Sequence, residues 1–134
     1  MKTIKMNMDP LIIGASEERP GINFDPQSNK FLIFGKSFPE EAKNFYEPVM
    51  LWLEEYARNP NQETNFEIRL DYYNSATSTI LLELIQLMNR LYKKGHKVKI
   101  IWHYLEVDDD MLDAGKEFSE MVEVPFEFIP FEDI

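Results

Sequence analysis

The stretch TNFEIRLDYYNSATSTILLELIQLMNRL, residues 64–91, contains the transition that decides the fold. Its first ten residues alternate between apolar and polar side chains, the period of a strand with one buried face. Apolar residues then recur at helical spacing: Ile80, Leu81, Leu84, Ile85, Leu87, Met88 and Leu91. Lys93, Lys94 and Gly95 follow as last-turn cations and C-cap. The stretch therefore predicts a strand over residues 64–73, with Tyr72 on its buried face, followed by a helix.

A run of small polar residues separates this strand from the helix. Five of six consecutive positions are polar: Asn74, Ser75, Thr77, Ser78 and Thr79. Capping the helix needs one such side chain. A phosphoryl group at a helix N-terminus would meet free backbone N–H groups and the positive end of the helix dipole. Two interpretations therefore stay open. The polar run either only caps the helix, or it contains a phosphorylation site whose phosphate would alter a partner-binding surface.

Upstream of this stretch, the sequence predicts a hairpin and a long helix. Residues 22–24 and 31–35 read as two strands joined by turn-forming residues, and residues 11–13 are compatible with a further edge strand. Ser37 and Glu40 have capping-box spacing, which predicts that the helix begins there. Pro48 is expected to kink this helix or to divide it before it ends at Asn59.

Downstream, the pattern predicts a strand over residues 97–106, a helix over 108–122 and a strand over 125–131. The expected order is β-β-α-β-α-β-α-β. Strands that are joined through helices must run parallel, with the helices packed on the sheet. The chain is thus expected to be a single-domain α/β sandwich with a mixed β-sheet, spanning residues 1–134, with residues 1–20 partly irregular.

Composition excludes several classes of partner and site. The 24 acidic residues outnumber the 14 basic ones, and the formal charge of −10 repels nucleic acid and anionic membranes. Without cysteine the chain has no disulfide, thiolate metal site or cysteine nucleophile. The first residues lack the apolar run of a signal peptide, and no stretch approaches the length of a membrane span. A cytoplasmic protein is expected.

Catalytic signatures are scarce in this sequence, and no catalytic residue, cofactor or metal site is predicted. Residues Asp108, Asp109 and Asp110 are interpreted as a helix N-terminus, not as a cation site, because the helix dipole favours carboxylates there. Two alternatives to a regulatory role stay open. One is a small enzyme that uses His103 with a carboxylate such as Glu106 or Asp71. The other is a structural subunit that buries an apolar patch in a homodimer.

Five segments together resemble the SiaC family of bacterial regulatory phosphoproteins, over nearly the whole chain. They are PGINFD, FGKSFPEEAKNFYEPVMLWLEEY, LDYYNSATSTILLEL, GHKVKIIWHYLEVDDDMLDAGKEF and PFEF, in this order. The order of elements, with a hydroxyl-rich turn between strand and helix, also looks like that of a STAS-type domain, the class that includes anti-sigma-factor antagonists. The resemblance implies a STAS-like partner-switching protein without enzymatic activity.

The resemblance also implies a site and a set of partners. In this family the phosphoacceptor is a threonine that directly follows an asparagine, and the matching residue here is Ser75, with Thr77 as a secondary candidate. Ala76 and Thr79 depart from the family pattern, which has a hydroxyl residue and commonly a lysine at these positions. The implied partner-binding surface is Asn74, Ser75, Ala76, Thr77 and Ser78. The implied partners are a serine/threonine kinase, a PP2C-like phosphatase and a diguanylate cyclase, with cyclic di-GMP signalling and biofilm regulation as the output.

Overall fold

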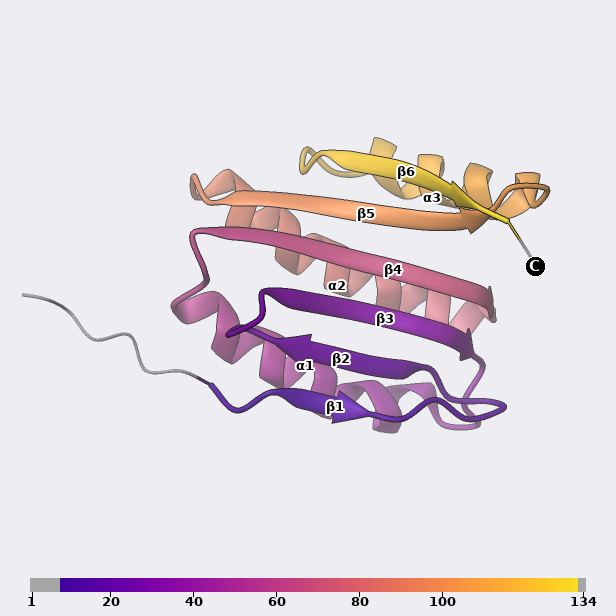
Figure 1. The fold of residues 1–134 in the computed structure, drawn as a ribbon, viewed down its shortest axis with the longest axis horizontal. Helices are drawn as coiled ribbons and strands as arrows, with labels where there is room; N and C mark the ends of the chain where they lie inside the picture. The colour runs from indigo at the N-terminus through magenta and orange to yellow at the C-terminus, as the bar shows by residue number, and fades with distance from the viewer. Residues whose placement is uncertain (1–7, 133–134) are drawn as a thin grey trace, which may run out of the picture.

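A computed structural model describes residues 8–132 as one mixed sheet with three helices (Figure 1). Its elements are β1 (Leu11–Ile13), β2 (Gly21–Asp25), β3 (Lys30–Ser37), α1 (Ala42–Arg58), β4 (Glu63–Tyr73), α2 (Ser75–Lys93), β5 (Lys97–Leu105), α3 (Asp109–Glu120) and β6 (Phe126–Phe131). The strands lie in the order β1 to β6, and β1, β2 and β3 pair antiparallel, whereas β3, β4, β5 and β6 pair parallel. The predicted α/β sandwich with a mixed sheet is confirmed, and the edge strand that the sequence left open is present as β1.

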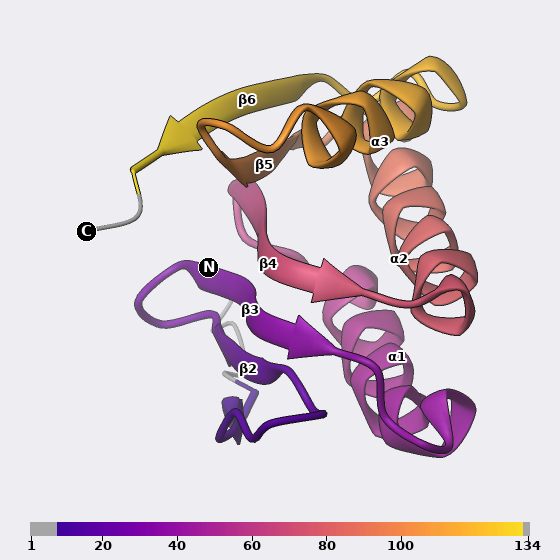
Figure 2. The same cartoon turned by 90° about the vertical axis from the view of Figure 1, so that its right-hand side faces the viewer.

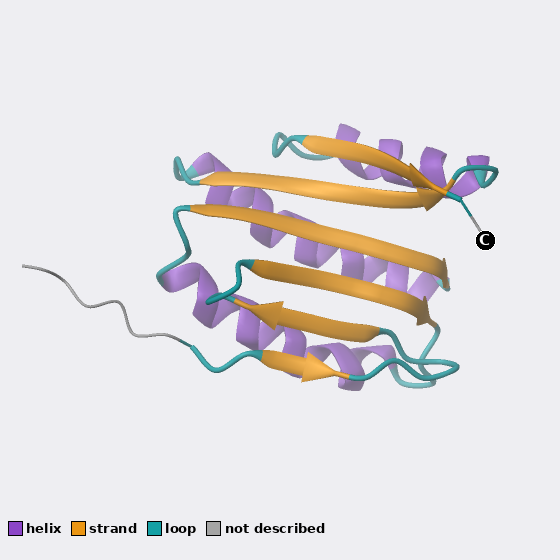
Figure 3. Ribbon diagram, in the orientation of Figure 1, coloured by secondary structure: helices purple, strands orange, loops and turns teal. Residues whose placement is uncertain are grey.

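All three helices cover the same face of the sheet (Figures 2 and 3). Phe66, Ile68 and Leu70 of β4 turn toward the helices and are buried, as the alternation predicted. The apolar stripe of α2 supplies the facing layer, with Leu81, Leu84, Ile85 and Met88 fully buried. The core therefore lies between one sheet face and the helices. Within residues 8–132, no helix is long and apolar enough to cross a membrane.

The four parallel strands end at one edge of the sheet, where the three helices begin. Figure 2 looks onto this edge. We call it the carboxyl edge, and it consists of the ends of β3, β4, β5 and β6 and the first turns of α1, α2 and α3. The hydroxyl-rich turn after Tyr73 lies there, because it joins the end of β4 to the start of α2.

A bulge near the end of β4 reverses which side chains face the core. Gly35 of β3 pairs with Leu70, but Lys36 pairs with Tyr72, so Asp71 is an extra residue without a partner on β3. One extra residue exchanges the two faces of a strand. Tyr73 accordingly packs against the core, whereas Tyr72 is 52% exposed. The prediction that placed Tyr72 on the buried face was wrong for this reason.

Helix α1 begins later than the sequence predicted and ends at Arg58, as predicted. The capping box at Ser37 and Glu40 was wrong, because Ser37 ends β3 and is fully buried, and the helix begins at Ala42 after Glu41, whose side chain makes no capping hydrogen bond. Pro48 lies inside α1 and does not divide it. Pro48 has no N–H to donate to the carbonyl of Asn44, four residues earlier. Both residues are exposed, so water can hydrogen-bond to that carbonyl instead.

Candidate functional site

The turn between β4 and α2 is capped by Asn74, as one interpretation of the sequence predicted. Asn74 Oδ1 accepts a hydrogen bond from the Thr77 N–H at 2.9 Å, and the Asn74 carbonyl accepts one from the Ser78 N–H at 3.0 Å. The N–H groups of Ser75 and Ala76 come before the first complete helical turn and make no hydrogen bond to any residue of 8–132. The turn therefore presents two free donors at the positive end of the α2 dipole.

Ser37, at the end of β3, holds this turn in place from below. Its carbonyl accepts hydrogen bonds from the Asn74 N–H at 3.1 Å and from Thr77 Oγ1 at 3.0 Å. Its hydroxyl lies 2.9 Å from Thr77 Oγ1 and 2.7 Å from the Tyr46 hydroxyl. Both Ser37 and Thr77 have 0% exposure, and Tyr46 has 2%. Ser37 thus ties the start of α2 to both β3 and α1 through four buried hydrogen bonds.

The direction of the hydrogen bonds between these three hydroxyls follows from counting protons. Each hydroxyl has one proton to donate. Thr77 donates its proton to the Ser37 carbonyl, so Ser37 must donate its own to Thr77 Oγ1. Tyr46 is then the donor to Ser37 Oγ. We call Tyr46, Ser37 and Thr77 the hydroxyl chain, and this single arrangement satisfies all three members.

Burial raises the pKa of Tyr46 from 10.0 to about 12, against a smaller opposing effect of its hydrogen bond to Ser37. The folded state therefore binds the phenolic proton more tightly than the unfolded chain does. This contribution to stability is fully present below pH 10 and is lost as the pH rises through about 12. Its size is on the order of 2 kcal/mol.

We expect Tyr46→Phe to be less stable than the wild type at neutral pH by about 1 kcal/mol, because it lacks the hydrogen bond to Ser37. The difference should shrink above pH 10 and reverse in sign as the pH approaches about 12, since only the wild type loses the larger contribution of the buried phenol. Urea unfolding of both proteins across this range measures the effect. A stability difference that does not change with pH would contradict it.

The five residues of the predicted partner-binding surface are not equally accessible. Ser75 and Ala76 are exposed, and Asn74 and Ser78 are partly buried. Thr77 is completely buried, and its hydroxyl is held by Ser37. In this conformation a kinase can reach the Ser75 hydroxyl, which makes no hydrogen bond within residues 8–132, but not the Thr77 hydroxyl. Thr77 supports the turn from inside.

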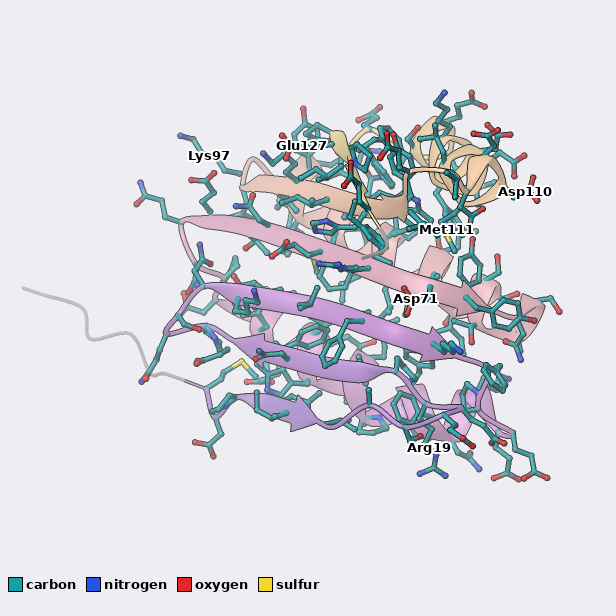
Figure 4. The ribbon with its side chains drawn as sticks, turned by 45° about the vertical axis from the view of Figure 1, so that its right-hand side comes forward. Arg19, Asp71, Lys97, Asp110, Met111 and Glu127 are labelled. Carbon is teal, nitrogen blue, oxygen red and sulfur yellow. The ribbon has the colours of Figure 1, made fainter. Side chains whose placement is uncertain are left out.

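Carboxylates surround the carboxyl edge. Asp108 caps α3 by accepting a hydrogen bond from the Met111 N–H at 3.0 Å, as the sequence predicted, and Asp109 and Asp110 occupy its first turn. Figure 4 shows Asp71 and Asp110 toward this edge and Lys97 toward the opposite one. The pKa of Tyr73 is raised to about 12, by burial first and then by the charges of Glu117 and Asp108. The cations Arg19 and Lys36 also lie at this edge, among Glu40, Asp71 and Asp108.

His103 lies apart from the turn. Because Trp102 faces the helices, the next residue of β5 points to the helix-free face of the sheet. There the His103 Nε2 atom lies 3.0 Å from Glu67 Oε1 on β4. The carboxylate beside His103 is therefore that of Glu67, and not that of Glu106 or Asp71, which were the examples expected from the sequence. No group of three or more histidine and acidic residues within 8–132 is arranged to hold a metal ion.

Sequence reasoning missed two residues that position the turn, Ser37 and Tyr46. Ser37 lies 40 residues before Thr77 in the chain, and its spacing to Glu40 suggested a local cap instead. Tyr46 fits the apolar stripe of α1, so the sequence pattern explains it as a core residue and gives no sign that its hydroxyl bonds to Ser37. No local pattern marks either residue, because their contacts form only when β3 and β4 pair in parallel.

Comparison with known proteins finds one family and several solved structures. The family model described as SiaC family regulatory phosphoprotein matches residues 13–131. An uncharacterised protein of Pseudomonas aeruginosa (strain UCBPP-PA14) is 24% identical over 119 residues, which cover 89% of this chain and 94% of the relative.

The crystal structure of apo-SiaC from Pseudomonas aeruginosa has a TM-score of 0.83 at 24% identity and covers 91% of this chain and 99% of that one. SiaC in complex with the diguanylate cyclase SiaD, which it activates, has a TM-score of 0.85 at 23% identity, with 90% and 99% coverage. The fold is therefore shared with these proteins.

Proposed function

This chain belongs to the SiaC family of regulatory phosphoproteins, and from this premise we propose that reversible phosphorylation of Ser75 switches it. The unmodified form binds and controls a diguanylate cyclase, so that the output is cyclic di-GMP signalling and biofilm behaviour. The observation that carries the proposal is the exposed Ser75 hydroxyl at the N-terminus of α2, beside two amide N–H groups without partners.

The proposed mechanism is competition for the exposed turn. In the unmodified protein, an acceptor on the partner can take the free N–H groups of Ser75 and Ala76. A phosphoryl group on Ser75 brings three acceptor oxygens and nearly two negative charges to the same place. It occupies the space and takes these donors itself, as anions do at helix N-termini. The partner then loses both contact area and hydrogen bonds.

The turn can accept the phosphate without unfolding, because Ser75 is not part of the hydroxyl chain. The buried hydrogen bonds that hold α2 pass through Thr77 and Ser37. The switch is therefore a change of surface on a nearly rigid fold. Within the proposed partner-binding surface 74–78, the partner contacts Ser75 and Ala76 at the centre and Asn74 and Ser78 at the margin.

Three kinds of partner complete the proposal. A serine/threonine kinase adds the phosphate, a PP2C-like phosphatase removes it, and the diguanylate cyclase responds. The protein itself acts by binding and not by catalysis. Because the kinase reaction and cyclic di-GMP synthesis both use cytoplasmic nucleotides, the proposed location is the cytoplasm.

The test uses the full-length protein purified from its native cells. Phosphopeptide mass spectrometry should find phosphate on Ser75 in the wild type, none at this turn in Ser75→Ala, and an unchanged level in the matched control Thr79→Ala, which removes another exposed hydroxyl. The diguanylate cyclase recovered with the protein is then purified, and its rate of cyclic di-GMP synthesis should rise when unmodified protein is added. Phosphate only at another residue, or a cyclase that neither binds nor responds, would show the proposal to be wrong.

A further inference from the structure

A groove of about 260 Å³ runs between α1 and α2, on the side of the helices that faces away from the sheet. Its apolar surface comes from Tyr46, Met50 and Leu51 of α1 and from Ile80 of α2. Leu51 is 57% exposed, a large value for a leucine beside other apolar side chains. Tyr46 and Ile80 form a buried floor with 2% and 8% exposure, so the open apolar surface of the groove comes mainly from Leu51. We call this feature the α1–α2 groove.

The groove reaches α2 at Ile80, after the turn that carries Ser75. Helices α1 and α2 both start at the carboxyl edge, so they run in the same direction and their first turns are neighbours (Figure 2). Ile80 follows the exposed Ala76 by one helical turn on the same side of α2. Tyr46, at the floor of the groove, is also the end of the hydroxyl chain that holds the turn. The phosphoacceptor turn and the groove therefore lie one helical turn apart along α2.

Carboxylates on the rim indicate the chemistry of the occupant. Glu47 of α1 and Glu83 of α2 flank the groove, are exposed, and make no ion pair within residues 8–132. Lys43 is the one cation among the residues that line it. A second copy of the chain would bring a rim of the same net negative charge to this groove, which is less favourable than a basic partner. A segment with an apolar side chain flanked by lysine or arginine fits both the floor and the rim.

We propose that the α1–α2 groove is the docking site for the partner, and that a basic, amphipathic segment of the diguanylate cyclase places an apolar side chain against Met50, Leu51 and Ile80. This inference rests on the proposed function and extends it from the turn to the groove. Docking there would position the partner's backbone over the free N–H groups of Ser75 and Ala76. The groove then provides affinity that does not depend on phosphorylation, and the turn provides the switch.

Binding of the purified cyclase to the full-length protein, measured by calorimetry, tests the groove. Leu51→Glu should weaken binding at least about tenfold, because it puts a charge against the apolar anchor. The double variant Glu47→Lys, Glu83→Lys should weaken it by about the same factor, mainly through slower association. The matched controls are Met121→Glu and the double variant Glu120→Lys, Glu123→Lys, which make the same changes of charge at exposed positions at and just after the end of α3, away from the groove, and should bind like the wild type. Circular dichroism checks that each variant is folded.

The possible results distinguish an error in the groove inference from an error in the proposed switch at Ser75. If the wild type neither binds nor stimulates the cyclase, the proposed function is wrong. If the wild type binds and both groove variants bind equally well, the groove inference is wrong while the switch at Ser75 stands. Light scattering that shows a wild-type dimer and a Leu51→Glu monomer would assign the groove to a second copy. Tighter cyclase binding by a variant without residues 1–7 would assign it to that segment. Either result would overturn the inference.

Discussion

Full phosphorylation of Ser75 is expected to weaken binding of the diguanylate cyclase by at least about tenfold. The phosphate takes the two free N–H groups of the turn, each worth about 1 kcal/mol as a hydrogen bond to the partner, and it adds a steric clash. Calorimetric titration of the two forms, with the extent of modification established by mass spectrometry, measures the change. The free energy of unfolding should not fall, because the Ser75 hydroxyl takes no part in the buried hydrogen bonds and a phosphate at a helix N-terminus is favourable.

Two variants serve as controls for this result. Ser75→Ala should bind the cyclase like the unmodified wild type, both before and after kinase treatment. Ser75→Asp should weaken binding less than the phosphate does, because a carboxylate carries about half the charge and fewer acceptor oxygens. If the wild type is completely modified at Ser75 and its affinity for the cyclase is unchanged, the switch mechanism is refuted.

Ser37→Ala is expected to lower the free energy of unfolding by about 2–4 kcal/mol, the largest effect of any change in the hydroxyl chain. It leaves the Tyr46 hydroxyl as a buried donor without an acceptor, since that hydroxyl points at Ser37 Oγ and is only 2% exposed. It also removes the donor to Thr77 Oγ1 and leaves a small cavity. The Ser37 carbonyl remains, so the helix start keeps part of its support.

Variants of the other two residues of the hydroxyl chain should lose less stability than Ser37→Ala, in a defined order. Thr77→Val leaves the Ser37 hydroxyl without an acceptor on α2 and should cost less, about 1–3 kcal/mol, whereas Tyr46→Phe removes only one donor and should cost least. The double variant Ser37→Ala, Tyr46→Phe should be no less stable than Ser37→Ala alone, because it also removes the orphaned hydroxyl. Urea unfolding measures all four proteins. Equal stability of Ser37→Ala and the wild type would contradict the assigned role of Ser37.

Local patterns in the sequence were enough for the order of the elements and for the caps of α2 and α3, but not for the start of α1. Strand β4 and helix α2 formed where alternation and helical spacing predicted them, because burial of one face is decided by the period of the apolar residues. Asn74 and Asp108 cap their helices as expected, since a cap needs only a side-chain oxygen close in sequence to free N–H groups. The assignment of Ser75 as phosphoacceptor came from family resemblance and stays a prediction.

Contacts between distant residues were decided only by the tertiary structure. The bulge at Asp71 exchanges Tyr72 and Tyr73 between the two faces, and only the pairing of β3 with β4 creates it. His103 meets Glu67 because β4 and β5 are neighbours, not because the two residues share a motif. Ser37 becomes the support of the turn once parallel strands end at the same edge. The sequence by itself determined which elements form and where the hydroxyl-rich turn lies. The packing of β3, α1 and α2 decided that Thr77 is buried and Ser75 exposed, because burial depends on neighbours that are far away along the chain.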